Sequence, residues 1–448
     1  MNPRAKLAAP PPKQSHYQGR MHALQKDLIG RWYQDLHGLW ERQQGNSRSD
    51  DGRWTGAVPI MVSGNCVELL RAFDLLPIYP EINALQLAIK KQALEFLLKA
   101  EERGYSTDSC GYVKADVAFY AEGAETPLKT RLPKPALVLC NFVGCNTYIK
   151  WFEHLAHMTG APLFMLDVPF LRRDRPSRED VAYVVRQLEE LIVVLERVSG
   201  RSFDIDRLRE ILALSAKTEQ RWSDIKALTK RRPSPFDAYF DSTTMMGPLY
   251  VSRGTEEGLN FFEETFKEFE EKAGLGVGVV PEERFRIVAE GPPPYPFFKA
   301  FRDLFTTWGA CNVASTYSCV GGTWEFGFRH DPADPLESIA LHMIEHNVTN
   351  RNYNQRYEQI ERYVREWEAD ARVIHSVNSC RLFSAGQGDM RERFSKELGI
   401  PTLFVESDLE DPRYYSAAQM RNRFDAFFES LAHKKSIEAS PAAMRNRP

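Results

Sequence analysis

The sequence predicts an α/β protein with two Rossmann-like lobes built on parallel sheets, preceded by a mainly helical N-terminal region. The length of 448 residues exceeds that of one ordinary domain and favours two or three. Beyond about residue 131, short apolar runs alternate with longer amphipathic runs, which is the order of parallel βαβ units. This alternation restarts after a glycine-rich turn at 274–278, so a second lobe is expected there.

The pattern divides the chain into successive parts. The mainly helical N-terminal region spans 21–130 and carries the first of the candidate ligand residues described below. The first α/β lobe spans 131–279, and the second spans 280–435. The remaining parts are a flexible arm at 1–20 and a polar tail at 436–448.

Individual elements are assigned from the spacing of apolar residues. An amphipathic helix is expected at 83–103 in the N-terminal region. Strands are expected at 136–140, 162–168, 286–289, 312–315, 372–377 and 402–406. Further helices are expected at 147–159, 181–198, 205–229, 250–273, 297–308, 335–370, 389–398 and 417–432.

The composition is that of a globular protein with a sizeable core, with 43% hydrophobic and 27% charged residues. The formal net charge is −3 and no basic block dominates, which argues against nucleic acid and anionic membranes as partners. The start of the chain lacks the apolar core of a secretory signal, and no segment reaches the roughly 18 apolar residues of a membrane span. A cytoplasmic protein is therefore expected.

Two motifs with known chemistry occur in settings that favour plainer interpretations. Residues 274–278 (GLGVG) follow an expected helix, whereas a dinucleotide fingerprint follows a strand. Residues 342–346 (HMIEH) match the zinc pattern of inverted metalloproteases, which leaves a zinc site open beside a polar stripe on a long helix. No Walker-type Gly-x-x-x-x-Gly-Lys motif occurs, so any use of ATP requires another chain.

Seven cysteines are scattered along the chain without a secretory signal, which does not indicate a disulfide framework. Most cysteines in such a protein are small buried hydrophobic residues. Three of them occupy positions where ligands are expected. Cys145 follows the strand at 136–140 and opens a helix, and Cys380 lies just beyond the strand at 372–377. Cys110 lies in a polar loop after the first long helix.

Thiolates at such positions suit a metal site. Helix N-termini, and the carboxyl edge of a parallel sheet, favour bound negative charge. Three thiolates from distant segments are able to hold one [4Fe–4S] cluster and to leave one iron open to water or substrate. Position alone leaves two interpretations open, a cluster or three packed thiols, because no compact Cys-x-x-Cys motif occurs.

Distinct sequence segments surround these cysteines, and further segments lie near the end of the chain. They are 109–116 (SCGYVKAD), 145–153, 378–381 (NSCR), 386–387 (GQ), 401–408 (PTLFVESD) and 419–427 (QMRNRFDAF). Together they resemble the cysteine segments and closing helix of the 2-hydroxyacyl-CoA dehydratase/benzoyl-CoA reductase family. The resemblance covers about residues 55–432 and is more specific than any single segment.

The resemblance implies that Cys110, Cys145 and Cys380 each ligate one [4Fe–4S] cluster enclosed by Rossmann-like lobes. It implies an acyl-CoA substrate and a homologous second cluster-bearing subunit. It also implies a separate ATP-hydrolysing iron–sulfur activator that supplies single electrons at low potential. The other cysteines are expected to be structural: Cys66, Cys140, Cys311 and Cys319.

Features outside the cysteine segments favour the reductase branch. Residues 76–83 (LPIYPEIN), residues 291–297 (GPPPYPF) and the chain length resemble the larger cluster-bearing subunit of ATP-dependent benzoyl-CoA reductase. That resemblance implies reduction of the aromatic ring of benzoyl-CoA to a cyclic diene. Two alternatives stay open: a (R)-2-hydroxyacyl-CoA dehydratase subunit that works through a ketyl radical, and a non-catalytic iron–sulfur scaffold with four protein ligands.

Candidates for the proton donor, for the site of the aromatic ring and for phosphate binding are chosen by the sequence segment in which they lie. A radical anion must be protonated, and the candidate donors are Glu68, Glu81 and His375. The aromatic run at 324–328 (WEFGF) is a candidate slot for a planar ring, although core packing is the commoner fate of such residues. The candidates for binding the phosphates of coenzyme A are Arg172, Arg173 and Arg175.

Overall fold

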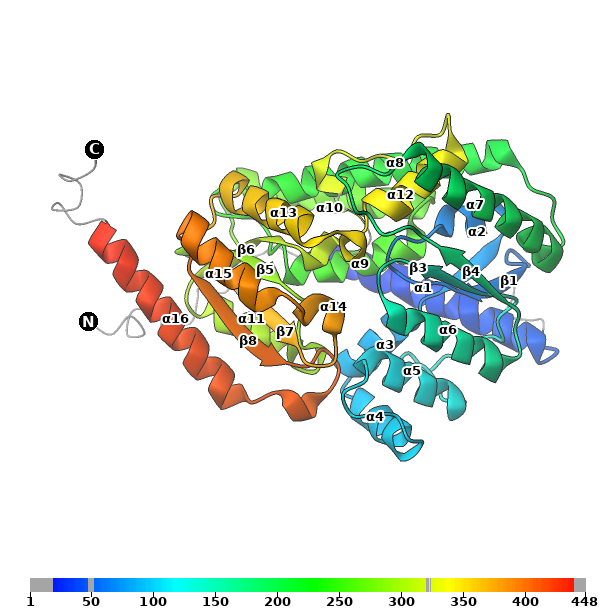
Figure 1. Ribbon diagram of the computed structural model, residues 1–448, viewed down its shortest axis with the longest axis horizontal. Helices are drawn as coiled ribbons and strands as arrows, with labels where there is room; N and C mark the ends of the chain where they lie inside the picture. The colour runs from blue at the N-terminus through cyan, green and yellow to red at the C-terminus, as the bar shows by residue number, and fades with distance from the viewer. Residues whose placement is uncertain (1–18, 47–51, 320–321, 323, 439–448) are drawn as a thin grey trace.

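The structure, a computed structural model, describes residues 19–46, 52–319, 322 and 324–438. Most of the expected arm and tail lies outside these residues. The protein is an α/β protein in which helices cover parallel sheets, as the sequence predicts. Figure 1 shows the two sheet regions on opposite sides of the molecule, with α16 (Ala417–Glu438) running along the outer edge of one of them.

The N-terminal region begins with α1 (Arg20–Gln43), a long helix that joins this region to the middle of the chain. Its apolar stripe, which includes Trp32 and Leu36, is buried against α9 (Phe240–Ser252) and α10 (Glu256–Gly274). The stripe fixes α1 against α9 and α10, next to β1.

The prediction of one helix at 83–103 is wrong in one respect, because the structure has two helices there. These are α3 (Pro80–Ile89) and α4 (Ala93–Glu102), and α4 packs on α5 (Gly111–Ala121). The chain turns at Lys91, whose φ of +60° lies in the left-handed region that ends a helix. The apolar spacing continues across this turn, so the sequence pattern alone shows no break.

The first sheet region consists of two pairs of short parallel strands. In one pair β1 (Gly56–Pro59) lies beside β2 (Leu75–Ile78), and the helix between them is α2 (Val67–Ala72). In the other, β3 (Val138–Phe142) lies beside β4 (Leu163–Asp167). The pairs adjoin, because the N–H of Ala136 donates to the carbonyl of Ala57 at 2.9 Å. The mainly helical region therefore contributes β1 and β2 to the first lobe.

The second sheet is continuous and entirely parallel, with the strand order β6-β5-β7-β8. Its strands are β5 (Phe285–Glu290), β6 (Ala310–Ser315), β7 (Ala371–Val377) and β8 (Thr402–Ser407). Every residue of β5, β6 and β7 is buried, as expected where helices cover both faces of a sheet.

Two further expected helices, at 250–273 and 335–370, are interrupted by new helix starts. Thr255 caps α10 by accepting a hydrogen bond from the N–H of Gly258, and Asn352 forms a capping box with Gln355. The remaining helices are α6 (Asn146–Thr159), α7 (Arg178–Ser199), α8 (Ile205–Leu228), α11 (Phe298–Thr306), α12 (Pro335–Glu345), α13 (Tyr353–Glu366), α14 (Arg381–Ser384) and α15 (Gln387–Leu398). Within the described residues, no helix has both the length and the apolar character needed to cross a bilayer.

The two lobes meet tightly at Gly144, one residue before Cys145. A Cβ atom at Gly144 would lie 2.2 Å from the carbonyl oxygen of Thr349, and the φ of Gly144 is +81°. The hydroxyl of Thr349 also donates to the carbonyl of Val143 at 2.7 Å. Only glycine fits this close approach of two backbones.

Replacing Gly144 with alanine is expected to lower the free energy of unfolding more than the matched change Gly200→Ala. Gly200 also has a positive φ of +69°, but no atom lies within 4 Å of a Cβ built there. Gly200→Ala should cost about 1 kcal/mol through backbone strain alone, and Gly144→Ala should cost at least about 1 kcal/mol more because of the clash. Urea unfolding of both variants provides the measurement, and equal losses would contradict the close contact.

Candidate metal centre

Cys110, Cys145 and Cys380 occupy equivalent places in the fold, since each is the N-cap residue of a helix. They precede α5, α6 and α14 respectively. The sequence places Cys145 at a helix start and Cys380 just beyond a strand, and the structure adds that Cys110 and Cys380 also begin helices. At such positions the first N–H groups of each helix have no partner within the helix.

The three cysteines line one cavity of about 390 Å³. Residues of both lobes and of the N-terminal region form its wall, and each cysteine side chain is partly buried. Most of the wall is apolar or aromatic, which keeps bulk water out of the space around the sulfur atoms. The aromatic residues that line it are Tyr112, Tyr148, Trp151, Tyr250, Phe298, Tyr317 and Phe383.

The three thiols interact with one another electrostatically. Burial raises the pKa of Cys110 well above its ordinary value, and the neighbouring Cys380 and Cys145 raise it further. Burial is also the main cause of the raised pKa of Cys145. It raises the pKa of Cys380 to about 11. Three buried thiolates would repel one another unless a cation lay between them. The site therefore favours a bound metal centre over three free thiolates.

Backbone N–H groups act on each sulfur in the same way. The N–H groups of Tyr112 and Val113 lower the pKa of Cys110, and those of Leu382 and Phe383 lower the pKa of Cys380. The corresponding groups of the first turn of α6 act on Cys145. No side chain caps these helices with a hydrogen bond of standard geometry. N–H groups directed at sulfur are a known means of stabilising iron–sulfur clusters, so the donor set fits such a cluster.

The three sulfur atoms are farther apart than the ligands of a single ion. A single zinc ion holds each thiolate about 2.3 Å from itself, which brings its ligands close together. Among the described residues, the one set of three potential ligand atoms that lie within 4.8 Å of each other contains none of these cysteines.

The other cysteines lie apart from the site. Cys140 is fully buried in the apolar core between β3 and α6, as expected from its place in the strand. Cys66 and Cys311 are also fully buried. Cys319 lies 2.7 Å from a carboxylate oxygen of Glu325 in a separate buried network. None of the four lines the cavity of the other three cysteines.

Glu81 is the one carboxyl group among the described residues that line this cavity. It lies in the first turn of α3 and is 3% exposed. The hydroxyl of Tyr148 donates to its Oε1 atom at 2.7 Å, and the N–H of Val62 donates to its Oε2 atom at 3.2 Å. Burial raises the pKa of Glu81 to about 7, although these hydrogen bonds oppose the rise. At neutral pH this carboxyl group is able both to hold and to release a proton.

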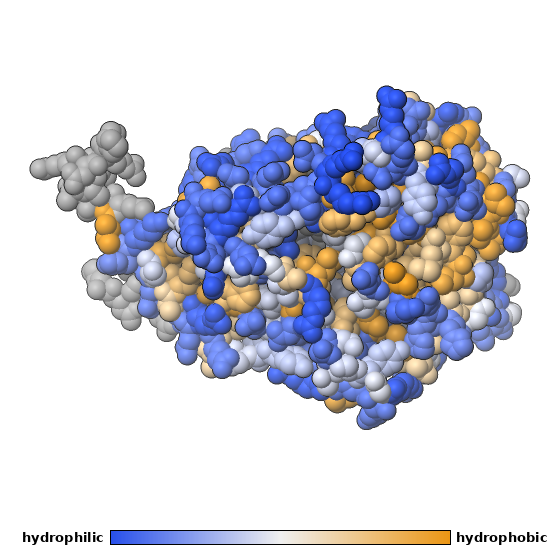
Figure 2. Space-filling model, viewed as in Figure 1, coloured by the Kyte–Doolittle hydropathy of each residue, from blue (hydrophilic) through white to orange (hydrophobic). Residues whose placement is uncertain are grey.

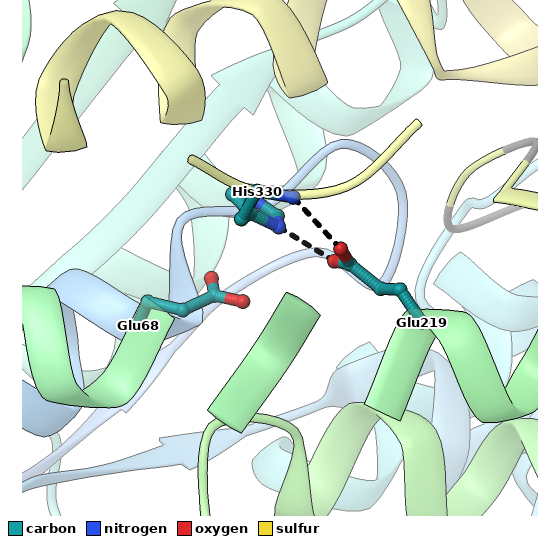
Figure 3. A group of neighbouring side chains, drawn as sticks. All are labelled: Glu68, Glu219 and His330. Carbon is teal, nitrogen blue, oxygen red and sulfur yellow. Dashed lines mark hydrogen bonds and ion pairs between the residues drawn. The ribbon is translucent and has the colours of Figure 1, made fainter. Parts of the chain in front are cut away.

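Glu68, a second candidate donor, belongs to a different buried group shown in Figure 3. The guanidinium of Arg253 donates to Glu68 at 2.6 Å, and the hydroxyl of Ser215 donates to it at 2.8 Å. Burial by itself would raise the pKa of Glu68, but Arg253 holds it well below its ordinary value. Glu68 is therefore an ionised partner of Arg253 and not a proton donor.

Glu219 and His330 complete that group. The Nδ1 atom of His330 lies 2.5 Å from Glu219 Oε1, and the N–H of His330 donates to Oε2 at 2.9 Å. The ligand atoms of Glu68, Glu219 and His330 lie within 4.8 Å of one another. Arg253 already supplies positive charge and each carboxylate is hydrogen-bonded, which favours an ion-pair network over a second metal site. Two nitrogen atoms of the group, Arg253 Nη1 and His330 Nε2, are buried without a hydrogen-bond partner.

His375, the third candidate donor, is held inside the second lobe. Its Nδ1 atom lies 2.5 Å from the carbonyl of Pro292, and its Nε2 atom lies 2.6 Å from the hydroxyl of Ser407. Burial lowers the pKa of His375 to about 4, so the ring is neutral at physiological pH. It does not line the cavity of the cysteines.

The family described as "2-hydroxyglutaryl-CoA dehydratase, D-component" matches residues 63–431. The chain belongs to this family. It is 39% identical to a benzoyl-CoA reductase subunit of Thauera aromatica over 92% of this chain and 94% of that protein. It is 30% identical to the (R)-2-hydroxyisocaproyl-CoA dehydratase alpha subunit of Clostridioides difficile over 83% of this chain and 89% of that protein.

A third relative in this family is the (R)-phenyllactyl-CoA dehydratase alpha subunit of Clostridium sporogenes. It is 27% identical over 83% of this chain and 88% of that protein. The chain is accordingly an enzyme subunit of the oxidoreductase or dehydratase kind. The resemblance seen in the cysteine segments is confirmed at the level of the family.

The other candidate residues predicted from the sequence do not line the cavity of the three cysteines. Trp324 is fully buried and stacks on His342 with ring centroids 5.7 Å apart, so the run at 324–328 does not form a slot in the cavity. His346 lies 3.1 Å from Glu345, and the HMIEH motif joins no cluster of metal ligands among the described residues. Arg172 and Arg173 are exposed, and Arg175 lines a separate cavity of about 1170 Å³.

One pair of residues that positions two of the cysteines was missed in the sequence. The Nε1–H of Trp151 on α6 donates to Asp116 Oδ2 on α5 at 2.8 Å, and both residues are buried. This bond ties together the helices that begin at Cys110 and Cys145. Asp116 lies within the segment SCGYVKAD, but no local pattern indicates that its partner is on the next helix.

Asp116 is expected to make stability fall as the pH rises. Burial raises its pKa to about 8, whereas an aspartate in the unfolded chain titrates near 4. The folded state therefore binds a proton that the unfolded state releases between about pH 4 and pH 8, and stability declines through this window. Asp116→Asn retains an acceptor for Trp151 and removes the titration.

The variant should exceed the wild type in unfolding free energy by at least about 1 kcal/mol near pH 8 and by less near pH 5. Urea unfolding at both pH values of protein prepared without metal provides the measurement. Asp206→Asn is the control, because the Asp206 side chain is 81% exposed. A pH trend that is the same in wild type and Asp116→Asn would show that the buried carboxyl group does not titrate as described.

Proposed function

We propose that this chain is the iron–sulfur subunit of an ATP-dependent benzoyl-CoA reductase. It reduces the aromatic ring of benzoyl-CoA to a cyclohexadiene-carbonyl-CoA with low-potential electrons from a separate activator. The observation that carries the proposal is the convergence of Cys110, Cys145 and Cys380 on one cavity with aromatic walls. The similarity to the Thauera aromatica benzoyl-CoA reductase subunit supports the choice of substrate.

Cys110, Cys145 and Cys380 would hold one [4Fe–4S] cluster. When bound, a cluster with three thiolate ligands supplies single electrons and an iron that is open to a substrate oxygen. The chain holds the thiolates at three helix N-termini, where the first N–H groups and the helix dipoles stabilise negative charge. This arrangement favours the thiolate form of side chains that burial alone would keep protonated.

The cavity wall serves the same reaction by excluding water. A donor strong enough to reduce an arene also reduces protons, so contact with bulk water would waste its electrons. Aromatic side chains from α6, α9 and α14 surround the cysteines, among them Trp151, Tyr250 and Phe383. They also provide flat apolar surfaces against which an aromatic ring is able to pack.

Glu81 is the group that we assign to hold the proton for the reduced ring. Its carboxyl group lines the same cavity as the three cysteines, and its pKa of about 7 is suited to proton transfer at neutral pH. The hydrogen bond from Tyr148 fixes its orientation. Neither Glu68 nor His375 lines the cavity. Arg253 keeps Glu68 ionised, and burial keeps the ring of His375 neutral, so neither has a pKa near 7.

The partners belong to the same proposal. The relatives are named as subunits, and we assign to this chain a homologous second cluster-bearing subunit and an ATP-hydrolysing iron–sulfur activator. The sequence contains no Walker-type phosphate loop, which agrees with ATP hydrolysis on the activator. Exposed apolar residues offer a surface for subunit contact, and Figure 2 shows apolar surface on the side where Figure 1 places β4 and α7. These exposed residues are Met165, Phe170, Tyr183 and Val193.

A subunit of a (R)-2-hydroxyacyl-CoA dehydratase is the second candidate, because the dehydratase relatives match most of the chain. The same cysteines and the same cavity would serve its ketyl-radical chemistry. An anaerobic assay with activator separates the two candidates: the reductase forms a cyclic diene from benzoyl-CoA, and the dehydratase forms an enoyl-CoA from a 2-hydroxyacyl-CoA. A non-catalytic scaffold would turn over neither substrate.

Each of the variants Cys110→Ser, Cys145→Ser and Cys380→Ser is expected to lose the cluster. Wild-type protein, purified without oxygen after co-expression with its partner, should contain about four irons per chain. Cys140→Ser is the matched control and should keep full iron, because Cys140 packs in the apolar core. Iron, acid-labile sulfide and low-temperature EPR provide the measurement. Iron-free wild type would refute the cluster, and loss of iron in Cys140→Ser would indicate a fourth ligand.

Glu81→Gln is expected to slow turnover of benzoyl-CoA without loss of iron. Glutamine keeps an acceptor for Tyr148 but cannot supply the proton, and removal of a general acid usually lowers kcat by about 10²-fold or more. KM and iron content should stay near wild-type values. Glu95→Gln is the control, since the Glu95 side chain is 66% exposed on α4. An unchanged kcat in Glu81→Gln would assign the proton to another group.

A further inference from the structure

Arg356 is a buried cation close to Cys380 with few partners of its own. It lies on α13, and its side chain is 14% exposed. Its Nε atom and one terminal nitrogen are buried without a hydrogen-bond acceptor. Glu290 Oε1 lies 3.6 Å from that nitrogen, which is beyond hydrogen-bond distance. Buried guanidinium groups are normally hydrogen-bonded. Arg253 Nη1 and the Nε and Nη1 atoms of Arg372 are also buried without a partner, but each of those two arginines forms a close ion pair, which Arg356 does not.

Glu290 is already occupied by a second arginine. Arg372, which is fully buried on β7, forms a closer ion pair with the other oxygen of Glu290. Burial lowers the pKa of Arg356 to about 10 and that of Arg372 to about 9, so both remain charged at neutral pH. One carboxylate therefore faces two buried guanidinium groups, and one positive charge is left without a matching anion.

The surroundings of Arg356 indicate where that anion would lie. Its guanidinium carbon is 5.9 Å from the ring centre of Phe383, which follows Cys380 by one helical turn. Phe383 lies on α14, the helix that begins at Cys380, and it lines the cavity of the cysteines. Arg356 itself does not line the cavity of the cysteines. Its charge therefore lies outside the cavity, beside the helix that begins at Cys380.

We propose that Arg356 is a positioning residue whose charge stabilises the reduced form of the metal centre held by Cys110, Cys145 and Cys380. The inference rests on the proposed function, because it requires a cluster at these cysteines. Reduction transfers one electron from a low-potential one-electron donor to the cluster, with no bond broken and no proton taken up. The cluster gains one negative charge, and a nearby fixed cation in a region of low dielectric lowers the free energy of that state.

The neighbouring acidic groups make such a cation necessary. Asp408 lies on the other side of the segment that contains Cys380, where its carboxylate accepts a hydrogen bond from the N–H of Ser379 at 3.1 Å. Glu81 lies on the cavity side and is also acidic. Without Arg356, the added electron would enter a site bordered by carboxyl groups. The backbone of Arg356 is held at the start of α13 by the capping box of Asn352, which keeps the side chain in a fixed place.

A redox titration followed by EPR tests this role in the anaerobically purified complex, with titanium(III) citrate as the electron donor. Arg356→Gln should lower the equilibrium constant for reduction at least tenfold, which makes the one-electron potential more negative by about 59 mV. Arg356→Lys should restore most of the difference because it keeps the charge. Arg365→Gln on the same helix is the control, and its potential should not change, because Arg365 is 64% exposed and its charge is screened.

The outcomes separate this inference from the proposed function. A wild-type potential in Arg356→Gln at full iron content overturns the inference and leaves the cluster in place. Loss of iron in both Arg356→Gln and Arg356→Lys also overturns it, because packing and not charge would then be required. Loss of iron in Arg356→Gln alone supports it. Iron-free wild type overturns the proposed function and the inference together.

Discussion

The convergence of three helix N-termini on one cavity is the constraint on which the rest of the site depends. Two of the helices follow parallel strands, so α6 and α14 begin at the carboxyl edges of β3 and β7. The third, α5, is held beside α6 by the bond between Asp116 and Trp151. Because a cysteine stands at each N-cap, where serine, threonine or aspartate would cap better, these helices give up capping energy to present sulfur.

Much of the fold follows from the sequence, because buried parallel strands are short apolar runs with clear ends, and all six expected strands are present. Helix breaks such as the one at Lys91 were harder to predict, since apolar spacing continues through them. Two of the cysteines that line the cavity, Cys145 and Cys380, follow strands that apolar runs define, whereas Cys110 was selected through the family resemblance. The roles of the acidic residues could not be predicted, because Glu68 and Glu81 are the same residue type in neighbouring segments. They differ only in their distant partners, Arg253 and Tyr148, so their opposite pKa shifts are properties of tertiary structure.

Buried charge in this protein falls into closed and open groups. In the group of Glu68, Arg253, Glu219 and His330, which we call closed, each carboxylate has a cationic or hydrogen-bonding partner. Groups of this kind join α2, α8 and the loop before α12. Glu81 and Arg356, which we call open, differ from this group, since Glu81 is buried without a cationic partner and two nitrogen atoms of Arg356 lack a hydrogen-bond acceptor. Incomplete pairing in the interior destabilises the fold, and it is found where a charged or reacting group is expected.

The distance along the chain between the cysteines has a consequence for the order of assembly. Cys110 and Cys145 belong to the first half of the chain and Cys380 to the last quarter. A centre bound by all three closes one very long loop and acts as a cross-link between the lobes, which disfavours the unfolded chain as a long-range disulfide does. The complete ligand set exists only after both lobes have docked. Insertion of iron would thus be a late event in biogenesis, and the empty protein would be the form most exposed to local opening and proteolysis.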